Sequence, residues 1–170
     1  YIMERRNAWL SYNEADEKAL EKLAKDYRTF LDNGKTEREC VSELSREAEA
    51  AGYVSLDKKL ASGEKIQTGD KIYAVGMKKI MALFHIGEDP MEKGMNILGA
   101  HIDSPRLDVK QNPLYEDTDL AYLDTHYYGG VKKYQWVAIP LALHGVVALK
   151  NGECVEVVIG EDADDAVVGV

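Results

Sequence analysis

The sequence predicts an α/β protein whose amino-terminal helices are followed by a sheet and then by a β-rich segment. Three observations indicate this fold class: two capped helical patterns fill the first third of the chain, strand patterns begin near residue 53, and strand patterns separated by turns continue after residue 108. Hydrophobic residues make up 45% and charged residues 30% of the 170 residues, a composition typical of globular proteins.

The first helix is predicted to begin at Ser11, because Ser11 and Glu14 have the spacing of a capping box. Gly34 is expected to end this helix in the left-handed conformation. The apolar residues of the helix share one face and are expected to pack inward: Ala15, Ala19, Leu20, Leu23, Tyr27, Phe30 and Leu31.

A second helix is predicted after a second capping box, formed by Thr36 and Glu39, and it is expected to end at Gly52. Cys40 on this helix is interpreted as a small core residue, since free cysteines are commonly buried. Both helices are expected to cover a face of the sheet. The residues of the second helix that are expected to face inward are Val41, Leu44, Ala48 and Ala51.

Strand patterns follow the helices. Residues 53–56 predict a short strand, and residues 58–70 predict a polar loop that contains glycines. Residues 71–77 and 80–87 predict two paired strands joined near Lys78 and Lys79. Residues 95–100 predict a buried strand, because this segment is short, uncharged and bounded by turn signals.

The remaining third of the chain predicts β-structure alone. Residues 120–128 alternate apolar and polar side chains, as a half-exposed strand does. Asn151-Gly152 lies between the apolar segments 146–150 and 155–159, which is a strong hairpin signal. This change in pattern predicts a domain boundary near residues 108–112.

Charge and cysteine content exclude several classes of protein. The net charge of −9 argues against nucleic acid and anionic membranes as main partners. Cys40 and Cys154 form no metal-binding or disulfide pattern, which fits a reducing compartment. No apolar segment approaches the roughly 20 residues of a membrane span, and no signal-peptide pattern is visible, so a cytoplasmic protein is expected. Neither end of the sequence looks natural, so we expect a piece of a longer protein.

The octapeptide His101–Asp108 is the most informative motif. It follows the predicted strand 95–100, and ligands bind open α/β sheets outside the carboxyl ends of the strands. A neutral imidazole binds zinc through one ring nitrogen, while its other nitrogen donates to a carboxylate or a carbonyl. His101 is therefore a candidate zinc ligand. Asp103 is a candidate partner that orients it, or a carboxylate beside the metal-bound water. The alternative is a structural His101 and an Asp103 that caps the turn before Ser104-Pro105.

Other catalytic patterns are missing. The chain contains no HExxH, GxSxG, GxGxxG or GxxxxGK[ST] sequence. His126 is a weaker candidate site residue, because a polar tip on a tyrosine-rich strand explains it better. One histidine does not hold a catalytic zinc, so the candidate site is incomplete.

Two sequence blocks resemble a known family. Residues 99–108 resemble the first metal motif of the M18 family of zinc aminopeptidases, the aminopeptidase I and aspartyl aminopeptidase group. Residues 126–136 and 140–147 are similar to a second block of its bacterial branch. The resemblance covers essentially the whole chain, and two long motifs in the same order are more specific than either alone.

The resemblance implies a cytoplasmic metallo-exopeptidase that removes the amino-terminal residue of peptides. Residues 1–108 would be the amino-terminal part of a zinc-peptidase-like α/β catalytic domain, and residues 109–170 the start of an inserted β-rich oligomerisation domain. The resemblance also implies a homo-oligomer, a dodecamer built from dimers. By motif match, His101 would be a zinc ligand and Asp103 the catalytic-site carboxylate that orients the site. Two zinc ions per full-length subunit are implied, with cobalt or manganese as alternatives, and the other ligands would lie beyond residue 170.

Two other interpretations stay open. The chain could be a non-catalytic structural or assembly module, or a pseudo-enzyme fragment, because it carries a single candidate ligand. It could also belong to a related metallopeptidase or deacylase with the same His-x-Asp strand end and a different inserted segment.

Overall fold

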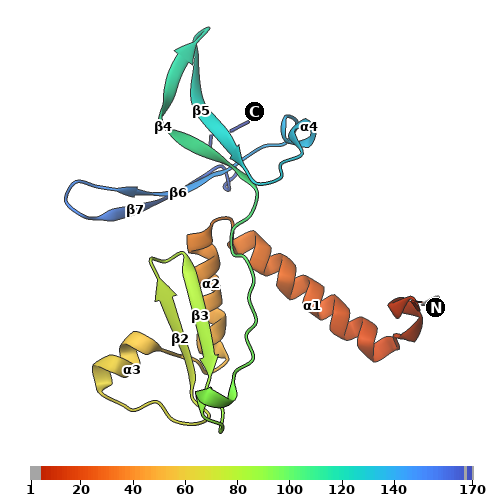
Figure 1. Cartoon of the computed structure of the whole chain (residues 1–170). Helices are drawn as coiled ribbons and strands as arrows, with labels where there is room; N and C mark the ends of the chain where they lie inside the picture. The colour runs from red at the N-terminus through yellow and green to blue at the C-terminus, as the bar shows by residue number, and fades with distance from the viewer. Residues whose placement is uncertain (1–4, 167, 170) are drawn as a thin grey trace. The chain divides into compact units, whose positions relative to one another are not determined.

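A computed structural model of the chain describes residues 5–166, 168 and 169. It divides into two compact units, residues 1–94 and 95–170 (Figure 1). The elements of the first unit are η1 (Ala8–Ser11), α1 (Glu14–Asn33), α2 (Glu37–Ala50), β1 (Val54–Ser55), α3 (Leu56–Ser62), β2 (Lys71–Gly76), β3 (Ile80–His85) and η2 (Met91–Lys93). Those of the second are β4 (Arg106–Asp117), β5 (Leu120–Tyr128), α4 (Lys133–Trp136), β6 (Leu143–Ala148) and β7 (Cys154–Ile159).

Helix α1 begins two residues later than the sequence predicted. The cap is Asn13, whose side chain accepts from the backbone N–H groups of Ala15 and Asp16, while the Asp16 carboxylate accepts from the Asn13 N–H. Ser11 instead lies in η1 and donates to the carbonyl of Ala8. The prediction was wrong because Asn13 and Asp16 form a competing capping box just downstream, and only one of the two can start the helix.

Gly34 ends α1, although not in the left-handed conformation that was expected. Its φ is −113°, and its N–H donates to the carbonyl of Phe30. Glycine is needed here for space, because a Cβ at Gly34 would lie 2.8 Å from the Sγ of Cys40. The absence of a side chain thus lets the end of α1 approach the first turn of α2 closely.

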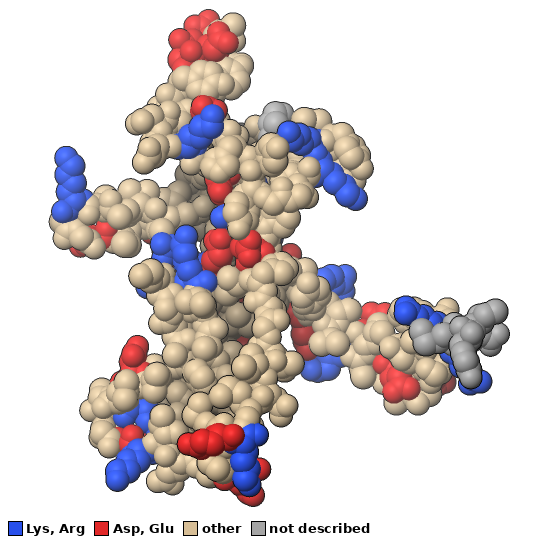
Figure 2. Space-filling model, viewed as in Figure 1, with Lys and Arg blue, Asp and Glu red and all other residues tan. Residues whose placement is uncertain are grey.

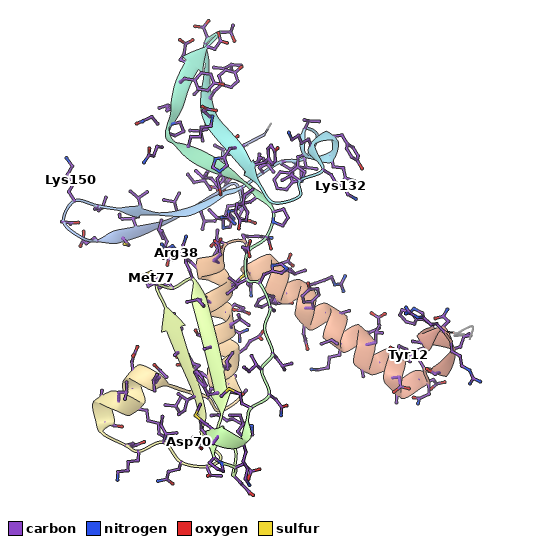
Figure 3. The ribbon with its side chains drawn as sticks, in the orientation of Figure 1. Tyr12, Arg38, Asp70, Met77, Lys132 and Lys150 are labelled. Atoms are coloured by element: carbon purple, nitrogen blue, oxygen red, sulfur yellow. The ribbon has the colours of Figure 1, made fainter. Side chains whose placement is uncertain are left out.

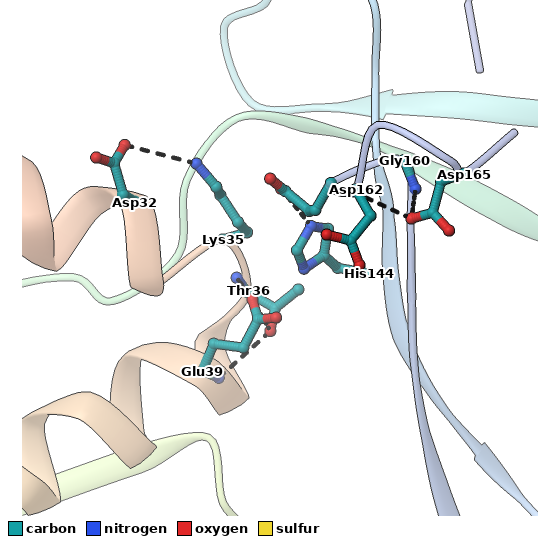
Figure 4. Close-up of polar contacts among 9 residues, drawn as sticks. Asp32, Lys35, Thr36, Glu39, His144, Gly160, Asp162 and Asp165 are labelled. Carbon is teal, nitrogen blue, oxygen red and sulfur yellow. Dashed lines mark hydrogen bonds and ion pairs between the residues drawn. The ribbon is translucent and has the colours of Figure 1, made fainter. Parts of the chain in front are cut away.

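Helix α2 begins at the predicted capping box: the Thr36 hydroxyl accepts from the Glu39 N–H, and the Glu39 carboxylate accepts from the Thr36 N–H (Figure 4). Cys40 is buried, as predicted, with 6% of its surface exposed. Glu43, which is also nearly buried, accepts from Asn33 of α1 and from Arg46. These donated hydrogen bonds lower the pKa of the Glu43 carboxyl, so its charge ties the two helices together across the neutral pH range.

The core of the first unit lies where α2 packs against β2 and β3. The buried hydrophobic side chains among the described residues are Cys40, Val41, Ala48, Ile72 and Tyr73. Helix α1 contacts α2, but the apolar face of α1 does not pack inward as predicted. Leu23 is 70% and Tyr27 59% exposed, because the described residues place no apolar surface over this part of the helix.

The three-stranded sheet has the order β1-β2-β3, with β1 parallel and β3 antiparallel to β2. The predicted pair of strands 71–77 and 80–87 is confirmed. Helix α3 connects the parallel strands β1 and β2, so the prediction of a loop throughout residues 58–70 was wrong at its start. Figure 3 shows Arg38 of α2 beside Met77 at the turn between β2 and β3, where the guanidinium donates to the Met77 carbonyl over 3.4 Å.

The second unit contains two hairpins and the one-turn helix α4, and its described residues form no buried core. The prediction of β-structure alone after residue 108 was therefore wrong at residues 133–136. Strands β4 and β5 pair from Arg106↔Tyr128 to Asp117↔Leu120, with a shift in register between Val109 and Leu114. This irregularity carries the strand past Pro113. Figure 2 shows acidic side chains gathered at the tip of this hairpin.

Strands β6 and β7 form the second hairpin, in register from Leu143↔Ile159 to Ala148↔Cys154. Asn151 and Gly152 lie at its turn, as the sequence predicted, and Gly152 has a positive φ of 91°. Within the described parts of the chain, no helix combines the length and the apolar character of a membrane span.

Ile72 is the side chain on which the small core of the first unit depends, since only 2% of its surface is exposed. We expect Ile72→Ala to lower the free energy of unfolding by about 3 kcal/mol, through lost burial and the cavity left behind. Ile80→Ala is the matched control: Ile80 lies on the neighbouring strand β3 but is 66% exposed, and its loss should cost less than about 1 kcal/mol. Urea denaturation of the two variants measures both values, and equal losses would contradict this description of the core.

Candidate metal centre

The segment that carries the candidate ligand, residues 95–105, forms neither helix nor strand. Ile97 is 79% exposed and Leu98 100% exposed. The prediction of a buried strand over residues 95–100 is therefore wrong for this structure. A strand needs neighbouring strands that accept its backbone hydrogen bonds, and none of the described strands pairs with this segment.

His101 is held by a local hydrogen bond. Its Nδ1 lies 2.8 Å from the backbone carbonyl oxygen of Asp103. A carbonyl can only accept, so Nδ1 carries the proton and Nε2 is left with its lone pair. The side chain is 83% exposed. The tautomer and the exposure together make Nε2 the atom of His101 that can bind a metal ion.

The carboxylate of Asp103 is held from the other side of the hairpin. The hydroxyl of Tyr128, on β5, donates to Oδ2 of Asp103 over 2.8 Å, whereas Oδ1 lies 3.7 Å from Nδ1 of His101. The Tyr128 hydroxyl and the backbone hydrogen bond of Asp103 itself lower the pKa of the Asp103 carboxyl, and His101 and Arg106 add to this effect. The carboxylate is therefore ionised at neutral pH.

Arg106 links these groups to the strand pair. Its guanidinium lies over the ring of Tyr128, 4.4 Å from the ring centroid, and its Nε donates to Oδ1 of Asp108 over 2.7 Å. Asp108 Oδ2 lies 3.7 Å from Nε2 of His126. These contacts follow from the register, because Arg106 is opposite Tyr128 and Asp108 is opposite His126.

The structure thus brings together the two sequence blocks, residues 99–108 and 126–136, at the base of one hairpin. His101 and Asp103 were predicted from the sequence as site residues, with His126 as a weaker candidate, whereas Tyr128 and Arg106 were not. Both residues stand inside the two blocks. The sequence alone does not place Arg106 opposite Tyr128, because this pairing depends on the shift in register between Val109 and Leu114.

The donor set is incomplete for a catalytic zinc ion. Searching the described residues finds no group of three or more histidine, cysteine, aspartate or glutamate side chains placed to hold a metal ion. Catalytic zinc sites use three protein ligands and a water. His101 and Asp103 have the chemistry of one part of such a site, and a zinc ion at His101 would need further protein ligands.

A second polar cluster lies at the end of the β6–β7 hairpin (Figure 4). His144 Nε2 is 2.9 Å from Oε1 of Glu161. Oδ2 of Asp165 accepts from the backbone N–H groups of Gly160 and Asp162 over 2.7 Å and 3.3 Å. Glu161 thus contacts His144 of β6, and hydrogen bonds from backbone N–H groups, those of Gly160 and Asp162 first, lower the pKa of Asp165. The cluster is structural, because its polar atoms stabilise the turn that follows β7.

Comparison with known proteins decides the family. The model of the family described as "Aminopeptidase I zinc metalloprotease (M18)" matches residues 30–170. The chain belongs to the M18 family. The resemblance inferred from the two sequence blocks is therefore confirmed.

Curated M18 relatives are similar over almost the whole chain. A probable M18 family aminopeptidase 1 from Clostridium acetobutylicum is 54% identical over 99% of this chain and 36% of its own length. The corresponding protein from Borrelia garinii is 41% identical over 97% of this chain and 35% of its own length. The chain thus spans about a third of the length of the curated relatives it matches.

Solved M18 structures share the fold. The crystal structure of aminopeptidase I from Borrelia burgdorferi has a TM-score of 0.86 and 40% sequence identity, over 95% of this chain and 39% of that one. Aminopeptidase I from Clostridium acetobutylicum has a TM-score of 0.83 and 54% identity, over 100% of this chain and 37% of that one. The α/β fold class is confirmed. The division at residue 108 and the roles of His101 and Asp103 remain predictions.

Gly129 lies where the hairpin base meets the segment that carries His101. Its φ is +73°, and a Cβ at this position would lie 3.3 Å from Pro105. We expect Gly129→Ala to lower the free energy of unfolding by about 1–2 kcal/mol, because alanine is strained at positive φ and the Pro105 backbone cannot easily move. Gly130→Ala is the matched control, since a Cβ there meets nothing within 4 Å. Thermal unfolding of the two variants gives the comparison, and equal effects would contradict the close packing of Gly129 on Pro105.

Proposed function

We propose that the full-length protein that contains this chain is a zinc-dependent aminopeptidase, which removes the amino-terminal residue of peptides. The observation that carries the proposal is the geometry of His101, whose Nε2 is left able to bind metal by the hydrogen bond from Nδ1 to the Asp103 carbonyl. Membership of the M18 family, shown by the match over residues 30–170, supports the same activity.

In this proposal each of the two residues has one role. His101 would bind a zinc ion through Nε2, and the fixed tautomer keeps that nitrogen unprotonated. Asp103 would act as a positioning residue, because its backbone carbonyl accepts from Nδ1 of His101 and its carboxylate is held by the Tyr128 hydroxyl. Zinc, when bound, would polarise the scissile carbonyl and lower the pKa of a water molecule. Parts of the full-length protein that this chain does not contain would supply the other ligands of this zinc ion, the ligands of a second zinc ion, and the general base.

We further propose peptides as substrates, residues 109–170 as the start of an inserted oligomerisation domain, and a homo-oligomeric full-length protein. The exposed apolar side chains of the β4–β5 hairpin support assembly, since Leu114 is 72% and Leu120 57% exposed. Tyr115 and Tyr122 stack on the same hairpin with ring centroids 5.2 Å apart. A reducing, cytoplasmic environment remains a prediction from the two free cysteines.

A second candidate is a non-catalytic assembly module. The observation that favours it is the incomplete donor set, because the described residues hold no group of three potential ligands. The two candidates differ in one property of the full-length protein, namely whether it hydrolyses aminoacyl anilides in a way that a chelator abolishes and zinc restores.

The test of the proposal is the activity of full-length His101→Ala. Removing the ligand should lower zinc-dependent turnover by more than about 100-fold. Mutation of a residue that only hydrogen-bonds to a metal ligand already lowers metal affinity or activity by roughly 10–100-fold. His85→Ala serves as the matched control, because His85 is an exposed histidine at the end of β3 in the other unit. Full zinc occupancy and unchanged turnover in His101→Ala would contradict the role of His101 as a zinc ligand. No turnover by folded, zinc-loaded wild-type protein would favour the assembly module.

A further inference from the structure

We propose that Tyr128 is a positioning residue of the metal centre: its hydroxyl fixes the Asp103 carboxylate in the orientation that the centre requires. The inference rests on the proposed function, because it assigns a residue to the same site. It extends that function to the second sequence block, residues 126–136, which supplies neither His101 nor Asp103. The hydroxyl lies 2.8 Å from Oδ2 of Asp103, across 25 residues of sequence.

The segment that carries Asp103 needs such a restraint. Residues 95–105 are outside any helix or strand, so the hydrogen-bond ladder of a sheet does not fix their backbone. The side chain of Asp103 is about one-third exposed, at 36%, so packing alone does not select one rotamer. A hydrogen bond from a residue on a paired strand supplies the missing constraint, because β5 is itself held in register by β4.

Tyr128 is well placed to act as a rigid donor. Its ring lies under the guanidinium of Arg106, 4.4 Å from the ring centroid, which fixes the direction of the phenol. The next residue, Gly129, has a positive φ and lies against Pro105, so the chain turns immediately after the tyrosine. Arg106 thus restrains the ring of Tyr128, and the turn at Gly129 restrains its backbone. Because the side chain is already ordered, its hydrogen bond to Asp103 costs little conformational entropy.

The neighbouring tyrosine provides the contrast. Tyr127 points to the opposite face of the strand, since successive side chains alternate, and its ring lies beneath the ammonium of Lys133 at 4.1 Å. Tyrosine and phenylalanine rings both support such a cation–π contact. Replacing Tyr127 by phenylalanine therefore removes a hydroxyl from the same strand without changing the Asp103 contact.

The experiment compares Tyr128→Phe with Tyr127→Phe in the full-length protein. Tyr128→Phe keeps the ring under Arg106 and deletes only the hydroxyl, so circular dichroism should be unchanged. We expect zinc affinity, measured by competition with a chromophoric chelator, to fall about tenfold, and kcat to fall by a similar factor with KM unchanged. Tyr127→Phe should stay within about twofold of wild type.

A double variant tests the route of the effect. If Tyr128 acts through Asp103, then Tyr128→Phe should change zinc affinity little once Asp103→Ala is already present. An equal further loss in the Asp103→Ala background would show that the hydroxyl acts by another route, and would overturn the inference.

His101→Ala separates the inference from the function on which it depends. Loss of zinc affinity in His101→Ala together with no change in Tyr128→Phe would overturn the role of Tyr128 and leave the proposed function intact. Unchanged zinc affinity in His101→Ala itself would overturn the proposed function, and the inference with it.

Discussion

The register of the β4–β5 hairpin is the constraint on which the candidate site depends. Pairing Arg106 with Tyr128 brings the phenol hydroxyl within 2.8 Å of Asp103 and places the guanidinium over the phenol ring. A slip of one residue would turn Tyr128 to the opposite face and put Tyr127 in its place. The irregular segment 95–105, which carries His101 and Asp103, would then lose the hydrogen bond that Asp103 accepts from Tyr128 of β5.

The two units differ in what stabilises them. The first unit has a small buried core between α2 and the sheet, together with a nearly buried carboxylate, Glu43, that joins two helices. The described residues of the second unit bury no side chain fully, and backbone pairing and polar contacts at the hairpin bases hold them in place. The site residues thus depend on hydrogen bonds and cation–π contacts more than on hydrophobic packing.

Local signals in the sequence predicted much of the fold. The capping box at Thr36, the strand pair around Lys78 and the turn at Asn151-Gly152 were identified correctly, because each depends on residues adjacent in sequence. The strand at residues 95–100 was not, because a buried strand requires distant partners that apolar composition alone does not specify. The same holds for the candidate site. The sequence predicted His101 as a zinc ligand, whereas the hydrogen bond from Tyr128 depends on a strand register that the sequence pattern left open.

In the proposed site, His101 binds zinc through Nε2 while Tyr128 holds Asp103. The most direct test is a crystal structure of the full-length protein with anomalous diffraction measured at the zinc absorption edge. We expect an anomalous peak about 2.1 Å from Nε2 of His101, with the hydrogen bond from Tyr128 to Asp103 retained. A zinc ion bound elsewhere with His101 unliganded, or one bound through Nδ1, would contradict it.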